Sequence, residues 1–318
     1  MGVRRKTRPR RRTPLIAAAV ASLLSAGYAA SGSAAAADGP PPQPPPQLTQ
    51  AKVDGAVDAL DRVIQDGMKK TGVPGVAVAV VYKDKVVYLK GFGERQVGRS
   101  GAVGPDTVFE VASLSKPLAS TVVAGAVGDK SIGWDDPVAG QLPRFALKDP
   151  WVTEHVTVAD LFSHRSGLPD HSGDLLEDLG FDRTYILEHL KYEPLSPFRA
   201  SYAYTNFGVT AAGQAVANAN GTTWEKLAED TLYDPAGMNS TSSRFSDYDK
   251  AENKAVIHVK GADGSWEAKN VRDADAQSPA GGASSTARDM ATWMRLQLAN
   301  GKLGGEQIIP ADPLERTH

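Results

Sequence analysis

The spacing of apolar positions predicts a long helix followed by a β-hairpin at the start of the folded part. From Thr49 onward, apolar side chains recur at steps of three and four residues, which indicates an amphipathic helix ending at Gly72. Two β-branched runs follow at 76–82 and 86–92, and Lys83-Asp84-Lys85 lies between them as the hairpin tip. This order favours an α+β fold over a doubly wound parallel sheet.

Helical segments are predicted again beyond the hairpin. Residues 118–127 have helical composition, and Pro117 suits a first helical turn because it lacks an N–H group and its φ is fixed. Thr157 and Asp160 have the spacing of a capping box, which predicts a short helix within 157–170.

The C-terminal part continues this mixture of helix and hairpin. The stretch from 170 to about 240 has the composition of loops and helices, and "KAVIHVKGADGSWEA" predicts a second hairpin turning at 262–264. Thr286 and Asp289 predict another capping box, for a helix that ends at Asn300-Gly301. We therefore expect an antiparallel sheet flanked by helices, together with a mostly helical subdomain.

The first 37 residues have the pattern of a secretory signal peptide. A basic head precedes the apolar run 15–30, and small residues follow up to Asp38. The alternative, an uncleaved membrane anchor, is disfavoured because the run is short and rich in alanine. Arg11-Arg12 leaves open whether export uses the general or the twin-arginine route. We expect a secreted protein with a leader at 1–37, a proline-rich linker at 38–48 and a folded domain at 49–318.

Charge and cysteine content narrow the function classes. The whole chain has a net charge of −2, but seven basic and no acidic residues lie in 1–37, so the mature chain would carry −9. This charge argues against nucleic acid or an anionic membrane surface as the partner. The chain has no cysteine, so no disulfide is expected, and its six histidines lack metal-ligand spacing. We expect neither metal nor cofactor.

The stretch "EVASLSKPLAS", at 110–120, contains the candidate nucleophile. A serine hydroxyl needs a base within hydrogen-bonding reach, and a lysine can serve when burial lowers its pKa. Ser113 and Lys116 form the only Ser-x-x-Lys in the chain, and apolar residues surround the lysine. On a helix, this spacing places both side chains on the same face. So short a motif also arises by chance, so it needs support from elsewhere.

A second candidate element is Tyr204-Thr205-Asn206. No other tyrosine in the chain has an asparagine two residues on. A tyrosine hydroxyl near a lysine can carry a proton to a leaving group, and an amide nearby can orient a substrate. Taken alone, Tyr204 would be read as a half-buried aromatic residue near a helix start.

Together these motifs resemble the serine β-lactamase and penicillin-binding peptidase superfamily. The closest likeness is to its branch of class C β-lactamases, D-Ala-D-Ala carboxypeptidases and esterases. Four stretches between about 49 and 310 carry the likeness, in family order: "FEVASLSKPL", "VADLFSHRSGLPD", "YAYTNFG" and "SPAGGASSTARDMATWM".

The resemblance implies a role for each of these residues. Ser113 would be the acylated nucleophile, Lys116 its base partner, Tyr204 the proton relay and Asn206 a substrate-contacting amide. It also implies that His164 and Asp170 are structural, shaping the loop below the site.

One family element has no match in the expected position. The family carries Lys-Thr-Gly or His-x-Gly on a strand beside the nucleophile, after the helix at 287. Three copies of these patterns occur elsewhere. One precedes the nucleophile at 70–72, one lies in an expected loop at 171–173, and one lies in an expected turn at 302–304. We therefore expect the sequence to be C-terminally incomplete and its turnover to be slow, because losing one oxyanion donor lowers a rate about 10²–10³-fold.

We expect an exported serine hydrolase that forms an acyl-enzyme. Its substrate would be a small molecule or peptide: a β-lactam, a D-Ala-D-Ala-type peptide, or a small ester or amide. The alternative is a catalytically impaired penicillin-recognising fold that acts as a binding or regulatory protein. The α/β-hydrolase class is disfavoured because the chain has no Gly-x-Ser-x-Gly. The oligomeric state is left open.

Overall fold

A computed structural model describes residues 48–269 and 271–318 of the 318-residue chain. Its internal contacts divide the chain into two units, 1–53 and 54–318, and the features below belong to the second, except residues 50–53 of the first helix. The expected leader, and all but the last residue of the expected linker, lie outside the described residues.

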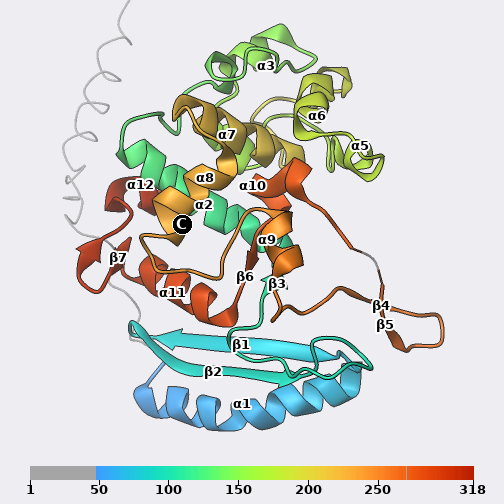
Figure 1. Cartoon of the computed structure of the whole chain (residues 1–318). Coiled ribbons are helices and arrows are strands. Elements are labelled where there is room, and N and C mark those ends of the chain that lie inside the picture. The colour runs from blue at the N-terminus through green and yellow to red at the C-terminus, as the bar shows by residue number, and fades with distance from the viewer. Residues whose placement is uncertain (1–47, 270) are drawn as a thin grey trace, which may run out of the picture. The chain divides into compact units, whose positions relative to one another are not determined.

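The predicted hairpin forms one layer between two helices. β1 (Gly75–Tyr82) pairs antiparallel with β2 (Lys85–Gly93). The helix α1 (Gln50–Thr71) lies along one face of this pair and α11 (Ala287–Leu298) along the other (Figure 1).

The tip of this hairpin differs from the prediction. Lys85 belongs to β2, so the turn has two residues, Lys83 and Asp84, and not three. Their φ angles of 48° and 58° are the positive values that a tight two-residue hairpin turn requires.

Two almost fully buried helices form the centre of the helical region. α2 (Ser115–Gly128) and α7 (Asn206–Ala219) contact each other and are rich in alanine, valine and glycine. Small residues also let other segments approach these helices: a Cβ at Gly125 of α2 would lie 2.3 Å from the side chain of Thr231, in the segment 229–233. Both helices are apolar on nearly all sides, as expected for helices in the core.

Shorter helices surround this pair (Figure 1). The α-helices are α3 (Pro150–His155), α4 (Val158–Phe162), α5 (Asp174–Asp178), α6 (Arg183–His189), α8 (Trp224–Ala228), α9 (Phe245–Lys250), α10 (Ser278–Gly281) and α12 (Ala311–Glu315). The 3₁₀ turns are η1 (Ala112–Leu114), η2 (Val138–Gly140), η3 (Leu190–Tyr192) and η5 (Asp275–Gln277), and η4 (Glu229–Tyr233) is a π-helical turn.

The remaining sheets of the described chain are also antiparallel pairs. They are β3 (Phe109–Glu110) with β6 (Ser284–Ser285), β4 (His258–Lys260) with β5 (Trp266–Ala268), and β7 (Lys302–Leu303) with β8 (Glu306–Gln307). The second predicted hairpin is therefore present as β4 and β5, and its turn lies at 262–264. The mixed α and β architecture with antiparallel pairing matches the predicted fold class.

One of the two predicted capping boxes is complete. Thr157 and Asp160 cap α4 reciprocally, although the helix ends at Phe162, before the glycine and proline expected to stop it. At α11, Thr286 accepts the N–H of Asp289 as predicted. The carboxylate of Asp289 instead accepts hydrogen bonds from the backbone N–H of Ser240 and the hydroxyl of Thr241, so it joins two segments.

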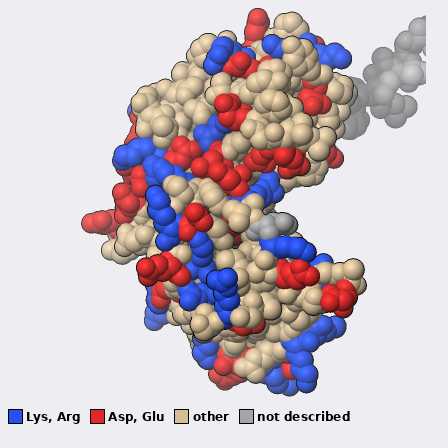
Figure 2. Space-filling view, turned by 45° about the vertical axis from the view of Figure 1, so that its right-hand side comes forward, with Lys and Arg blue, Asp and Glu red and all other residues tan. Residues whose placement is uncertain are grey.

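Two surface properties bear on possible partners. On the face shown in Figure 2, acidic and basic side chains are interspersed. A mixed face of this kind differs from the continuous basic surface that binds a phosphate backbone. Within residues 48–269 and 271–318, no helix is both long enough and apolar enough to span a bilayer.

Candidate active site

Ser113 lies on a constrained turn. It belongs to the 3₁₀ turn η1, immediately before α2. The Ser113–Lys116 spacing had suggested that both residues lie on one helix, but Ser113 precedes it. Ala112 has a φ of 47°, in the left-handed region that non-glycine residues seldom adopt. The buried hydroxyl of Ser115 donates to the carbonyl of Ala112 (2.6 Å) and accepts from the N–H of Ala283 (2.9 Å). The turn is thus tied to a distant segment, and Ser113 is left exposed.

Lys116 connects three segments through its ammonium group. Its Nζ donates to the Oγ of Ser113 (3.2 Å), the Oδ1 of Asn206 (2.7 Å) and the carbonyl of Ala280 (3.0 Å). Burial lowers the pKa of Lys116 below its usual 10.5, and the phenol of Tyr204 opposes this shift in part. The lysine is therefore closer to losing a proton than a lysine in water, as its apolar surroundings predicted.

Tyr204 places its hydroxyl against the candidate nucleophile. The phenol oxygen lies 2.6 Å from the Oγ of Ser113, and the Nζ of Lys116 lies 4.6 Å from the centre of the ring. The structure therefore brings the side chains of all four predicted site residues together, because Asn206 is joined to the same lysine.

Two residues anchor the Tyr204 segment through its backbone. The Nδ1 of His164 accepts the N–H of Thr205 (3.1 Å), and the His164 ring packs 4.7 Å from that of Tyr204, measured between ring centres. Asp170 accepts the N–H of Tyr204. Burial, and then the charge of Lys116, lower the pKa of His164 to about 4, so the ring is neutral and Nδ1 can accept a hydrogen bond. These contacts are consistent with the structural roles that the resemblance implied for His164 and Asp170.

Asp174 belongs to the cluster although the sequence analysis did not select it. The Nδ2 of Asn206 lies 3.2 Å and 3.0 Å from the Oδ1 and Oδ2 of Asp174. The Nδ1 of His171 lies 2.9 Å from the same Oδ2. No local pattern marks this carboxylate, because Asn206 is 32 residues away.

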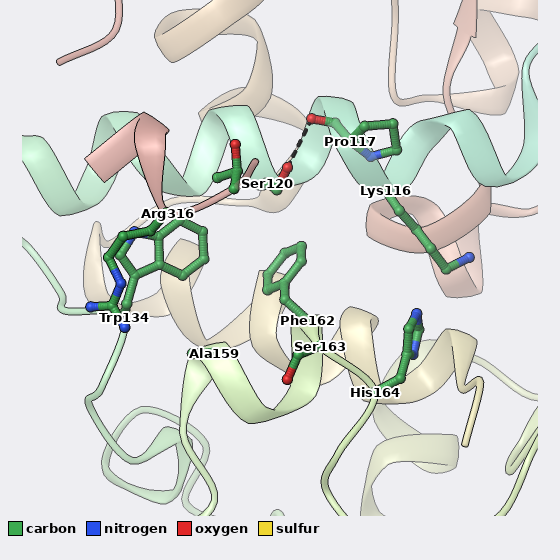
Figure 3. Close-up of a pocket in the computed structure, with 10 residues that line it drawn as sticks. Lys116, Pro117, Ser120, Trp134, Ala159, Phe162, Ser163, His164 and Arg316 are labelled. Atoms are coloured by element: carbon green, nitrogen blue, oxygen red, sulfur yellow. Dashed lines mark hydrogen bonds between the residues drawn. The ribbon is translucent and has the colours of Figure 1, made fainter. Parts of the chain in front are cut away.

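Two cavities adjoin the cluster. The first has a volume of about 390 Å³ and lies between α2 and the segment 159–164. Lys116 and His164 lie at one end, and Trp134 and Arg316 at the other (Figure 3). The second, of about 360 Å³, has a mostly apolar lining that includes Leu114 of the nucleophile turn. The two cavities thus border the Ser113–Lys116 segment, one at Lys116 and the other at Leu114.

The structure places the three copies of the third family pattern at a helix end, in a turn and in a short hairpin. Lys70 and Thr71 end α1 and Gly72 follows it, and residues 171–173 form the turn before α5. Lys302 and Leu303 do form a short strand, β7, contrary to the turn predicted there. In the described part of the chain, no group of three or more histidine, cysteine, aspartate or glutamate side chains is placed to hold a metal ion.

Comparisons with known proteins identify the family of this chain. Residues 60–317 match the family described as Beta-lactamase. The chain belongs to the β-lactamase family. A solved class C β-lactamase in complex with cefoxitin is similar in structure, with a TM-score of 0.67 and 25% sequence identity, over 82% of this chain and 69% of that one. This agrees with the superfamily and the branch that the motifs resemble.

Two curated proteins are similar to this chain in sequence. Beta-lactamase-like protein 2 of Dictyostelium discoideum is 27% identical over 76% of this chain and 46% of its own length. Unguisins hydrolase ungD' of Aspergillus campestris is 28% identical over 76% of this chain and 48% of its own length. The chain thus spans about half the length of these relatives, and the family membership supports a hydrolase type of function.

Proposed function

We propose that Ser113 is the acylated nucleophile of a serine hydrolase. The observation that carries this proposal is the position of its Oγ, 3.2 Å from the Nζ of Lys116 and 2.6 Å from the hydroxyl of Tyr204. Both neighbours can exchange a proton with that oxygen. The lowered pKa of Lys116 favours loss of a proton from the Lys116–Tyr204 pair, which can then accept the proton of Ser113.

The proposed mechanism follows from these contacts. The proton of Ser113 passes to the Lys116–Tyr204 pair as the Oγ attacks the substrate's carbonyl carbon and forms an acyl-enzyme. Tyr204 then delivers a proton to the leaving group, and a water molecule releases the acyl group by the reverse sequence. Asn206 keeps Lys116 in place through the bond to its Oδ1.

The proposed substrates are β-lactams, D-Ala-D-Ala-type peptides, and small esters or amides. Support comes from the family, from a structural neighbour described in complex with cefoxitin, and from a relative named as a hydrolase of unguisins. We also propose export of the protein, based on the leader-like residues 1–37. Amino-terminal sequencing of protein recovered outside the cell tests it: a start near Asp38 is expected, and an intact Met1 would contradict it.

Covalent labelling tests the proposed chemistry. The protein is incubated with a fluorophosphonate and with a fluorescent penicillin, and the adduct is located by mass spectrometry. We expect an adduct on Ser113 and none in Ser113→Ala, with Ser120→Ala as a labelled control. Penicillin that binds the protein and its Ser113→Ala variant equally, without any adduct, would identify a binding protein and overturn the proposal.

A further inference from the structure

We propose that Asp174 is a positioning residue of the acylation site, whose carboxylate holds the amide of Asn206 with its oxygen towards Lys116. This inference rests on the proposed function of Ser113. It adds a residue that neither the family likeness nor the sequence pattern assigns.

The hydrogen-bonding capacities of the three groups set the orientation of the amide. A lysine ammonium can only donate hydrogen bonds and a carboxylate can only accept them. Asn206 lies between the two, with its Oδ1 2.7 Å from the Nζ of Lys116 and its Nδ2 within 3.2 Å of both oxygens of Asp174. Rotating the amide by half a turn would place donor against donor and acceptor against acceptor. Asp174 therefore favours the orientation that Lys116 requires.

The backbone around Asp174 is itself fixed against the helix that carries Asn206. Asp174 is the first residue of α5 and follows Gly173, whose φ is 91°. A Cβ at Gly173 would lie 2.8 Å from both Ile186 and Phe207, and Phe207 follows Asn206 in α7. This close approach holds the start of α5 against α7 and keeps the carboxylate in reach of the amide.

Asp174 also contributes charge to the site. The titratable groups that act on Lys116 are the phenol of Tyr204, the carboxylate of Asp174 and the imidazole of His164, which Asp170 approaches in turn. The negative charge of Asp174 favours the ammonium form of Lys116. Its removal should let the lysine lose its proton at lower pH, and a residue with only a packing role would not cause that change.

The principal experiment compares Asp174→Asn with the wild type and with Asp178→Asn. Asp178 is an exposed acid on the same short helix and serves as the matched control. We expect Asp174→Asn to slow fluorophosphonate labelling of Ser113 about tenfold and to move the acidic limb of the pH–rate profile to lower pH. The control should change neither. A wild-type rate and profile in Asp174→Asn would overturn the proposal.

A double-mutant cycle tests whether Asp174 acts through Asn206. In an Asn206→Ala background, Asp174→Asn should cause no further loss of labelling rate, because the positioned group is gone. Equal losses in both backgrounds would overturn the positioning role. If Asp174→Asn does not fold, Asp174→Ser removes the same carboxylate and takes its place in the cycle.

Two measurements independent of catalysis separate this inference from the proposed function. Absence of Ser113 labelling in the wild type would remove the proposed function. The coupling between positions 174 and 206 in the free energy of unfolding, and the NMR titration of Lys116, would still decide the role of Asp174. A measurable coupling and a lower titration midpoint for Lys116 in Asp174→Asn support it, and zero coupling with an unchanged midpoint overturns it.

Discussion

The side-chain oxygens of Ser113 and Tyr204 lie 2.6 Å apart, although 91 residues separate them in the chain. So short a contact makes Tyr204 the group best placed to exchange a proton with the nucleophile. Tyr204→Phe keeps the ring and removes only the hydroxyl. We expect it to slow acylation of Ser113 by about a hundredfold or more, the usual range for loss of a general acid or base.

The control for this prediction is Tyr202→Phe. Tyr202 is exposed and precedes the same segment, so its loss of a hydroxyl should leave labelling unchanged. The measurement is the rate constant for fluorophosphonate labelling, with thermal unfolding to verify the fold. A Tyr204→Phe protein labelled as fast as Tyr202→Phe would exclude the phenol from the reaction.

The acylation rate should rise with pH. Burial lowers the pKa of Lys116 below 10.5, and the reaction needs a group at this position that can take up the serine proton. The rate should therefore increase as the ammonium loses its proton, with a midpoint below the value for a lysine in water. Labelling followed from neutral to alkaline pH checks this, and a rate that falls over that range would contradict the assignment of Lys116 as base.

Acid sensitivity of the fold should depend on His164. Its pKa is about 4 in the folded chain and near the usual 6.5 when unfolded. Between these values the unfolded chain binds a proton that the folded chain does not, so folding stability is lost as the pH falls through this window. The loss amounts to about 3 kcal/mol at most.

His164→Asn tests this effect. Asparagine tolerates the positive φ of 57° at this position and offers an oxygen to the N–H of Thr205, but it does not titrate. Denaturant unfolding at several pH values should show a shallower dependence on pH in the variant than in the wild type. Equal slopes in the two proteins would mean that other groups dominate the acid response.

Two glycines should respond oppositely to replacement by alanine. A Cβ at Gly213 would lie 2.7 Å from Pro279, in the short helix that also carries the Ala280 carbonyl bonded to Lys116. We expect Gly213→Ala to destabilise the fold by about 1–3 kcal/mol, as for other overpacked sites, and to slow labelling.

Gly67→Ala is the matched counterpart. Gly67 lies within α1, and a Cβ there would meet nothing within 4 Å. Alanine should therefore stabilise the helix by up to about 1 kcal/mol without affecting the site. Chemical denaturation of both variants is the measurement, and a stabilised Gly213→Ala would show that α10 can shift freely.

The sequence predicted those site residues that lie close to one another in the chain. Ser113 and Lys116 are three residues apart, and Tyr204 and Asn206 two, so each pair could be recognised from its own segment. The sequence could not reveal that Ala280 offers its carbonyl, because any residue has one. Asp174 was missed because nothing close to it in the chain distinguishes it from other acids, and its contact depends on how α5 meets α7.

The fold was predictable to a similar degree. Two β-branched runs marked the hairpin of β1 and β2, and three- and four-residue spacing marked α1. α7 has no polar side to define its limits, since it is buried on nearly every face. The pair of β3 with β6 joins two-residue strands that are far apart in the chain, so no local pattern indicates their pairing.

The bond between Lys116 and the carbonyl of Ala280 joins positions 164 residues apart. A nascent chain therefore cannot complete the site until that carbonyl has emerged from the ribosome and α10 has docked. Loop closure over such a distance is slow compared with helix formation. On dilution from denaturant, recovery of labelling at Ser113 should lag behind the return of helical circular dichroism, and simultaneous recovery would show that the two segments meet early.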